Sequence, residues 1–246
     1  MGAGSRGSIS GLASKPQRAA MTIERRHDRG LALIVVLLTV VLLSALGVAL
    51  VLATSAETRI AGNFRSAQQT LYAAEAAADR AIDDLALMPD WTPLLGGGVL
   101  SSFVDGSPGG VRKLDDGSLV DLTEVVALAN CQKTVACSNV DMDAVTDDRP
   151  WGPNNPRWTL FAFGPLRALL PAGAPPTPQY VVVMAGDDPG EIDNDPLSDG
   201  VAGASGAGIL ALRAEAFGPS GAHKVVELTV MRGASAVRVL SWRELR

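Results

Sequence analysis

The sequence is poor in the residues on which most enzyme active sites and metal sites depend. Its 246 residues include only two histidines, His27 and His223, and two cysteines, Cys131 and Cys137. Neither histidine lies near the cysteines in the sequence, and neither has a motif of a Ser/His/Asp triad around it. The glycine run at 96–98 lacks the lysine of a phosphate-binding loop. The sequence therefore predicts a protein that is not an enzyme.

An excess of positive charge is also missing. The formal net charge is −5, so the chain as a whole has no footprint of nucleic-acid contact. The basic residues are unevenly placed, however, and six of them precede Gly30: Arg6, Lys15, Arg18, Arg25, Arg26 and Arg29. A basic segment before an apolar run is typical of a cytoplasmic flank, because lysine and arginine resist translocation across a membrane.

Charged side chains are absent from residues 31–56 altogether. A helix rises about 1.5 Å per residue, so this run can cross a bilayer core of about 30 Å. Small residues at Thr54, Ser55 and Ala56 resemble the cleavage site of a secretory signal. The apolar core of such a signal is only about 7–15 residues long, so the length favours an anchor that is retained.

The helical pattern continues beyond the apolar run. Apolar residues recur at steps of three and four, which indicates one stripe along a helix: Ile60, Phe64, Ala67, Leu71, Ala74, Ala78, Ile82 and Leu85. Pro89 ends the pattern. We therefore expect one helix from about Leu31 to about Met88, on the order of 85 Å long, with an apolar first half and an amphipathic second half.

The remainder of the chain favours strands. The Asp116–Gly117 pair predicts the turn of a small hairpin. Short apolar runs bounded by glycine and proline predict strands at residues 157–164, 179–186, 208–218, 223–232 and 236–245. The predicted fold class is α+β, with a long N-terminal helix packed on a C-terminal antiparallel β-sheet.

Two further features bear on possible sites. Cys131 and Cys137 are predicted to form a disulfide if the chain beyond the anchor meets an oxidising compartment; the alternative is two unpaired small apolar residues. The acidic stretch at 187–199 carries Asp193, Asp195 and Asp199 as candidate Ca²⁺ ligands. It lacks the closing glutamate of an EF-hand loop, and a solvated loop is the alternative. His223 is expected to be an exposed residue beside a hairpin turn.

The segment from Arg29 to about Ile82 resembles the N-terminal region of the type IV pilins and pseudopilins, and in particular the PilX-type minor pilins. The residues that carry the resemblance are "RRHDRG" at 25–30, "RIAGN" at 59–63, "AAEAA" at 73–77 and "VLSWREL" at 239–245. The resemblance implies that a prepilin peptidase cuts between Gly30 and Leu31 on the cytoplasmic side. It also implies that the apolar helix then leaves the membrane and packs in a filament core.

One position departs from the family. Most pilins carry a glutamate at the fifth mature position, which pairs with the N-terminal amine of a neighbouring subunit, and here that position is Val35. The resemblance therefore implies a rare subunit at the filament tip. It would prime or cap a type IV pilus, which serves twitching motility, adhesion or DNA uptake. The alternatives are a tip pseudopilin of a type II secretion system and an uncleaved single-pass protein with a periplasmic binding domain.

The resemblance also implies an organisation, partners and a location. We expect a leader at 1–30 (21–30 if Met21 is the start), a transmembrane and filament-core helix at 31–56, its amphipathic continuation at 57–88 and a periplasmic head at 89–246. The implied partners are other minor pilins, the major pilin, the prepilin peptidase, the assembly platform and the membrane, with no nucleic-acid contact evident. The implied location is the bacterial inner membrane and then the pilus tip.

Overall fold

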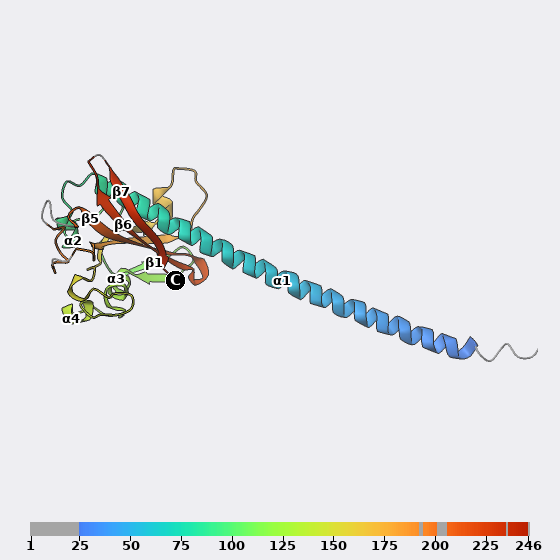
Figure 1. Ribbon diagram of the computed structural model, residues 1–246. Coiled ribbons are helices and arrows are strands. Elements are labelled where there is room, and N and C mark those ends of the chain that lie inside the picture. Colours follow the sequence, from blue (N-terminus) through green and yellow to red (C-terminus); the bar gives the residue numbers. More distant parts are fainter. Residues whose placement is uncertain (1–24, 192–193, 201–205, 235, 246) are drawn as a thin grey trace, which may run out of the picture. The chain divides into compact units, whose positions relative to one another are not determined.

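One unbroken α-helix, α1 (Arg25–Ala86), covers the predicted helical stretch except for its last two residues (Figure 1). The computed structural model describes residues 25–191, 194–200, 206–234 and 236–245, and divides into two compact units that meet between Arg59 and Ile60. The helix begins inside the predicted leader rather than at Leu31. It ends two residues before Met88, and a final turn in which the Leu87 N–H donates to the Asp84 carbonyl (3.2 Å) leads to Pro89.

The second unit contains the predicted antiparallel sheet. Its five strands follow one another in chain order: β3 (Thr159–Pro165), β4 (Tyr180–Asp187), β5 (Ile209–Phe217), β6 (His223–Arg232) and β7 (Val237–Leu245). Every neighbouring pair is antiparallel. The α+β fold class and the strand candidates are confirmed. Most residues of β3 to β6 are buried or partly buried on both faces, whereas most of β7 is exposed. Short β-branched and aromatic runs were sufficient to identify the strands.

Alanines bring the second half of α1 against one face of this sheet. The buried helix positions Ala74, Ala77 and Ala81 meet a core that includes Val181 and Leu212. Small side chains let the helix backbone approach the strands closely, so large residues of the sheet fill the space. Ile60 and Phe64, predicted as the start of the same stripe, are instead 68 % and 66 % exposed. The packed face of the helix is therefore shorter than the periodicity predicted.

A second core covers the other face of the sheet. The predicted hairpin is present as β1 (Val111–Lys113) and β2 (Leu119–Asp121), and α3 (Leu122–Cys131) follows directly. Leu122 and Val125 of α3 pack with Phe163 and Met184 of the sheet. The short helices are α2 (Thr92–Leu95), α4 (Asn139–Met142), η1 (Gly152–Asn154), η2 (Leu166–Leu169) and η3 (Pro219–Gly221). The second unit is thus layered as helix, sheet, then helix with hairpin.

Candidate functional site

The predicted processing position lies within the first turns of α1. Gly30 and Leu31 both have helical backbone conformation. A Cβ atom added to Gly30 would meet no other atom within 4 Å, apart from its own chain neighbours and the local helix backbone. The fold therefore does not require glycine at this position, so a substitution there can be used to test processing without disturbing the packing.

The segment after Gly30 is apolar on all sides. Its large side chains from Leu31 to Leu52 are 52–68 % exposed. By length and composition, α1 from Gly30 to Ala86 is the one helix in the described part of the chain that can cross a membrane, and its most apolar window has a mean hydropathy of 3.0. An exposed apolar surface of this size is unfavourable in water, so this segment is compatible with a membrane anchor.

Four hydroxyl groups in and directly after this segment are satisfied inside the helix. Thr39 Oγ1 donates to the Val35 carbonyl (2.8 Å), and Ser55 Oγ donates to the Val51 carbonyl (2.8 Å). Thr54 and Thr58 make the same kind of bond to the preceding turn. Internal satisfaction of polar groups is what a hydrocarbon environment demands. Val35 itself is 52 % exposed and presents only an apolar surface.

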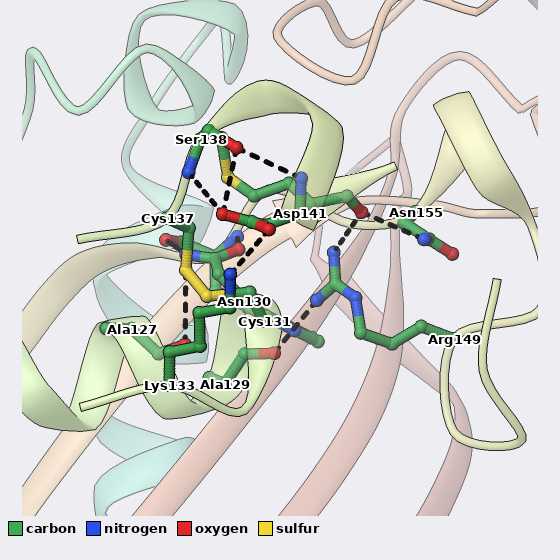
Figure 2. The surroundings of a disulfide bond; sticks show 12 residues. Ala127, Ala129, Asn130, Cys131, Lys133, Cys137, Ser138, Asp141, Arg149 and Asn155 are labelled. Atoms are coloured by element: carbon green, nitrogen blue, oxygen red, sulfur yellow. Dashed lines mark hydrogen bonds and ion pairs between the residues drawn. A yellow bond between two sulfur atoms is a disulfide. The ribbon is translucent and has the colours of Figure 1, made fainter. Parts of the chain in front are cut away.

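A disulfide closes the chain between α3 and α4. Cys131 and Cys137 are joined, with their Cα atoms 6.0 Å apart, and Figure 2 shows their surroundings. Ser138 caps α4 by accepting the Asp141 N–H (3.3 Å), while the Asp141 carboxylate accepts the Ser138 N–H (3.0 Å). Lys133 donates to the same carboxylate (2.6 Å), and these hydrogen bonds lower the pKa of Asp141 to about 2.

Arg149 links three segments near the disulfide from the inside: the end of α3, the end of α4 and the residues before β3. Its buried guanidinium donates to three backbone carbonyls, those of Ala129 (2.8 Å), Met142 (3.2 Å) and Pro156 (2.9 Å). The bond to Ala129 can be followed in Figure 2. Burial lowers the pKa of Arg149 to about 10, so the group is still charged at neutral pH. The role of Arg149 is thus structural, because its donors are directed at the chain's own backbone.

The acidic stretch is only partly within the described residues. Asp193 lies outside them, so the calcium prediction at Asp193, Asp195 and Asp199 stays a prediction. Asp199 accepts the Gly208 N–H (2.8 Å) and lies 3.6 Å from Arg232, while burial raises its pKa. Asp195 accepts the Leu197 N–H (3.4 Å). Among the described residues no group of three or more His, Cys, Asp or Glu side chains is arranged to hold a metal ion.

Charged residues occupy the face of β5 to β7 that is turned away from α1. Arg213 on β5 contacts both Glu215 (2.7 Å) and Glu227 (3.0 Å). His223, predicted as exposed, has a side chain 45 % exposed, pairs with Glu215 (2.8 Å) and stacks on Phe217 with ring centroids 4.5 Å apart. Burial alone would raise the pKa of Glu215, but the hydrogen bond from His223 and the charge of Arg213 outweigh it and lower the pKa.

The sequence interpretation missed α3 and the buried cation that supports it. Asp121 accepts the Thr123 N–H (2.9 Å) and caps α3, and Leu122, Val125 and Ala129 follow at helical spacing. These signals were present in the sequence. No sequence signal identified Arg149, because its carbonyl partners come from three separate segments of the chain.

The comparison with known protein families identifies the N-terminal part of the chain. Residues 29–79 match the family model described as PilX N-terminal. This range includes Gly30, the apolar segment, "RIAGN" and "AAEAA", so the resemblance carried by these residues is confirmed. Neither the curated proteins nor the solved structures contain a significant match to the chain.

Proposed function

We propose that this chain, which carries the N-terminal domain of the PilX-type type IV pilins, is a minor pilin that primes or caps pilus assembly at the filament tip. The proteins of that family are structural components of a filament rather than catalysts. The role is therefore one of assembly, and the useful surfaces are those that meet membrane lipid and other subunits.

The observation that carries the proposal is that the apolar side chains of α1 change from exposed to buried along the helix. Up to Leu52 its large apolar side chains are exposed, and from Thr70 onward one face is buried against the sheet. The first part needs lipid or other apolar helices around it, and the second part holds the head. Helices in lipid associate by packing and by lipid entropy rather than by a hydrophobic force between them, so the same surface can serve in a membrane and in a bundle of pilin helices.

The position of Gly30, between the basic leader and the apolar segment, supports removal of the leader. In the proposal a prepilin peptidase removes the basic leader on the cytoplasmic side and leaves Leu31 as the mature N-terminus. The precursor is a single-pass inner-membrane protein with its C-terminal domain in the periplasm, where the Cys131–Cys137 disulfide would persist. The mature subunit then joins other minor pilins, the major pilin and the assembly platform.

Val35 supports a place at the tip. A subunit inside the shaft brings its N-terminal amine next to the fifth residue of a neighbour, and a buried amine without a carboxylate partner is costly. Valine cannot supply that partner. A tip pseudopilin of a type II secretion system would share this feature and differ by its partners. An uncleaved single-pass protein would keep its leader and be absent from filaments.

The experiment compares two glycine variants in cells that assemble pili. Gly30→Val should block leader removal, so that the protein migrates as its precursor and surface pili are lost. Gly62→Val is the matched control, because an added Cβ there also meets nothing within 4 Å. The proposal fails if Gly30→Val is processed normally, or if cells lacking the protein assemble pili in normal number.

A further inference from the structure

The two edges of the five-stranded sheet differ in how they are covered. At the β3 edge the chain covers itself: the Ser101 N–H donates to the Phe161 carbonyl (2.8 Å), and Phe163 exchanges backbone bonds with Phe103 (3.1 Å) and Asp105 (2.9 Å). At the other edge lies β7, and in the described part of the chain no segment pairs with its outer side. An open edge offers unpaired N–H and carbonyl groups as a template for another strand.

The open edge is long, and its protection is limited to a bulge at Leu240 and a few charged side chains. β7 has nine residues and contains neither proline nor lysine, the residues that most often blunt an edge strand. Val239, Leu240 and Trp242 are 48 %, 49 % and 48 % exposed. A strand of this length leaves enough unpaired backbone groups to bind another strand. The side chains along it can then fix the register of that strand.

Side chains that face one another on β5, β6 and β7 form rows across the sheet. Each row ends at β7, where a further strand would continue it. On the face packed against α1, Leu212, Leu228 and Trp242 are opposite one another on three strands. The first two are 0 % and 5 % exposed, and the row ends at the half-exposed Trp242. The row of Leu210, Val230 and Val239 ends in the same way. A further strand with apolar residues on this face would complete both rows.

The opposite face carries a charge row that also stops at β7. Arg213, Glu227 and Arg243 are opposite one another on β5, β6 and β7. Their charges alternate, and Glu227 binds both arginines, at 3.0 Å from Arg213 Nη1 and 3.0 Å from Arg243 Nε. The position beyond Arg243 is therefore suited to an acidic side chain, because opposite charges on facing strands attract.

An antiparallel second copy of β7 supplies no acidic side chain at that position, because the other β7 residues on the face of Arg243 are Arg238, Ser241 and Leu245. The bulge at Leu240 shifts the alternation of β7, so that Arg238 and Arg243 lie on the same face. An antiparallel copy paired about Arg243 sets that arginine against itself. A copy that pairs Val239 with Trp242 sets Arg238 against Arg243. Facing like charges are destabilising, and no antiparallel register of β7 against itself that keeps like faces together sets a carboxylate opposite Arg243, so a segment of a different protein is the better match.

We propose that β7 is an acceptor edge, which takes an extended segment of a different protein as a sixth strand of the sheet. The segment alternates apolar side chains, toward Trp242 and Val239, with polar ones that include an acidic residue opposite Arg243. Backbone hydrogen bonds supply affinity, and the apolar and charged rows supply register and specificity. This inference rests on the sheet alone, so it stands or falls independently of the filament role.

The test uses the purified full-length chain in detergent micelles and two fluorescent nine-residue peptides. Both alternate valine with threonine; one has a central glutamate and its twin a central lysine. We expect the glutamate peptide to bind about fivefold more tightly, the scale set by one cross-strand charge pair. Hydrogen exchange should slow at residues 237–245 on binding.

Variants decide whether β7 is responsible. Arg243→Glu should invert the peptide preference, while Arg65→Glu, the same charge change on the exposed surface of α1, should leave it unchanged. Trp242→Thr should weaken both peptides equally and keeps the test valid if the charge reversal misfolds. The proposal is overturned if neither peptide binds, if protection appears outside residues 237–245, or if Arg243→Glu leaves the preference as it was.

Discussion

Asn130 and Trp158 are held to each other by two hydrogen bonds. The Asn130 Nδ2 donates to the Trp158 carbonyl (2.8 Å), and the Asn130 Oδ1 accepts the Trp158 N–H (2.8 Å). Both residues are 6 % exposed. Because Asn130 lies on α3 and Trp158 directly precedes β3, this pair ties α3 to the sheet.

Replacing Asn130 should therefore destabilise the head. Asn130→Leu leaves a buried N–H and a buried carbonyl of Trp158 without partners, which should lower the free energy of unfolding by about 3 kcal/mol. Urea unfolding followed by tryptophan fluorescence measures the change. Asn139→Leu, at an exposed position of α4, is the control and should change it by less than about 0.5 kcal/mol. Equal effects of the two variants would show that the paired hydrogen bonds are not important.

The disulfide should stabilise the fold by a modest amount. It closes a short loop, with a sequence separation of 6, so its loss should cost about 2 kcal/mol. The double variant Cys131→Ala/Cys137→Ala should show that loss in urea unfolding. Adding a reductant should destabilise the natural chain by a similar amount and leave the double variant unchanged. A reductant effect on the double variant would contradict this assignment.

Glu215 should make the head sensitive to acid. Its pKa is lowered in the folded chain, since the contacts with His223 and Arg213 outweigh burial. Such a group stabilises the fold above its unfolded pKa of about 4.3, and the stabilisation is lost as the pH falls through the folded pKa. The free energy of unfolding should thus fall more steeply below about pH 4.3 in the natural chain than in Glu215→Gln.

The control for this pH profile is Asp79→Asn, on the exposed side of α1. It should follow the natural chain at every pH. If Glu215→Gln shows the same steep fall as the natural chain, then Glu215 is not the group responsible.

The fifth mature position should govern how many copies enter the filament. Under the proposed function, Val35→Glu supplies a carboxylate for a neighbour's amine, so more of the protein should be recovered per mass of sheared pili. Val36→Glu places the same charge one residue away, on a different side of the helix, and should lower recovery. Quantitative mass spectrometry of sheared pili measures both. No difference between the two variants would remove the argument for a tip position.

Periodicity and strand patterns were enough to predict the backbone layout. The apolar run and the Ala-rich continuation predicted α1, because both local helix propensity and the buried face agree there. The five strands were recognisable because each is a short apolar run between turn residues. By contrast, Ile60 and Phe64 continue the stripe in the sequence but are exposed, since periodicity shows which side of a helix is apolar and not how far its partner extends.

The parts that depend on distant contacts could not be predicted in the same way. Arg149 is buried because three carbonyls from separate segments converge on it, and the sequence does not show that convergence. The charge row through Arg213, Glu227 and Arg243 requires the register of three strands, which a one-residue slip would destroy. The helix α3 had a cap and a helical pattern in the sequence, but these signals were not interpreted as a helix.

The most direct test of the proposed pilin role is to determine the N-terminal sequence of this protein recovered from sheared, washed pili. We expect a chain that starts at Leu31 and keeps the apolar residues up to Ala56. A chain in the medium that starts beyond Ala56 would mean that the apolar segment is a discarded export signal. A chain found only in the inner membrane, with Arg29 and Gly30 still attached, would equally contradict the account.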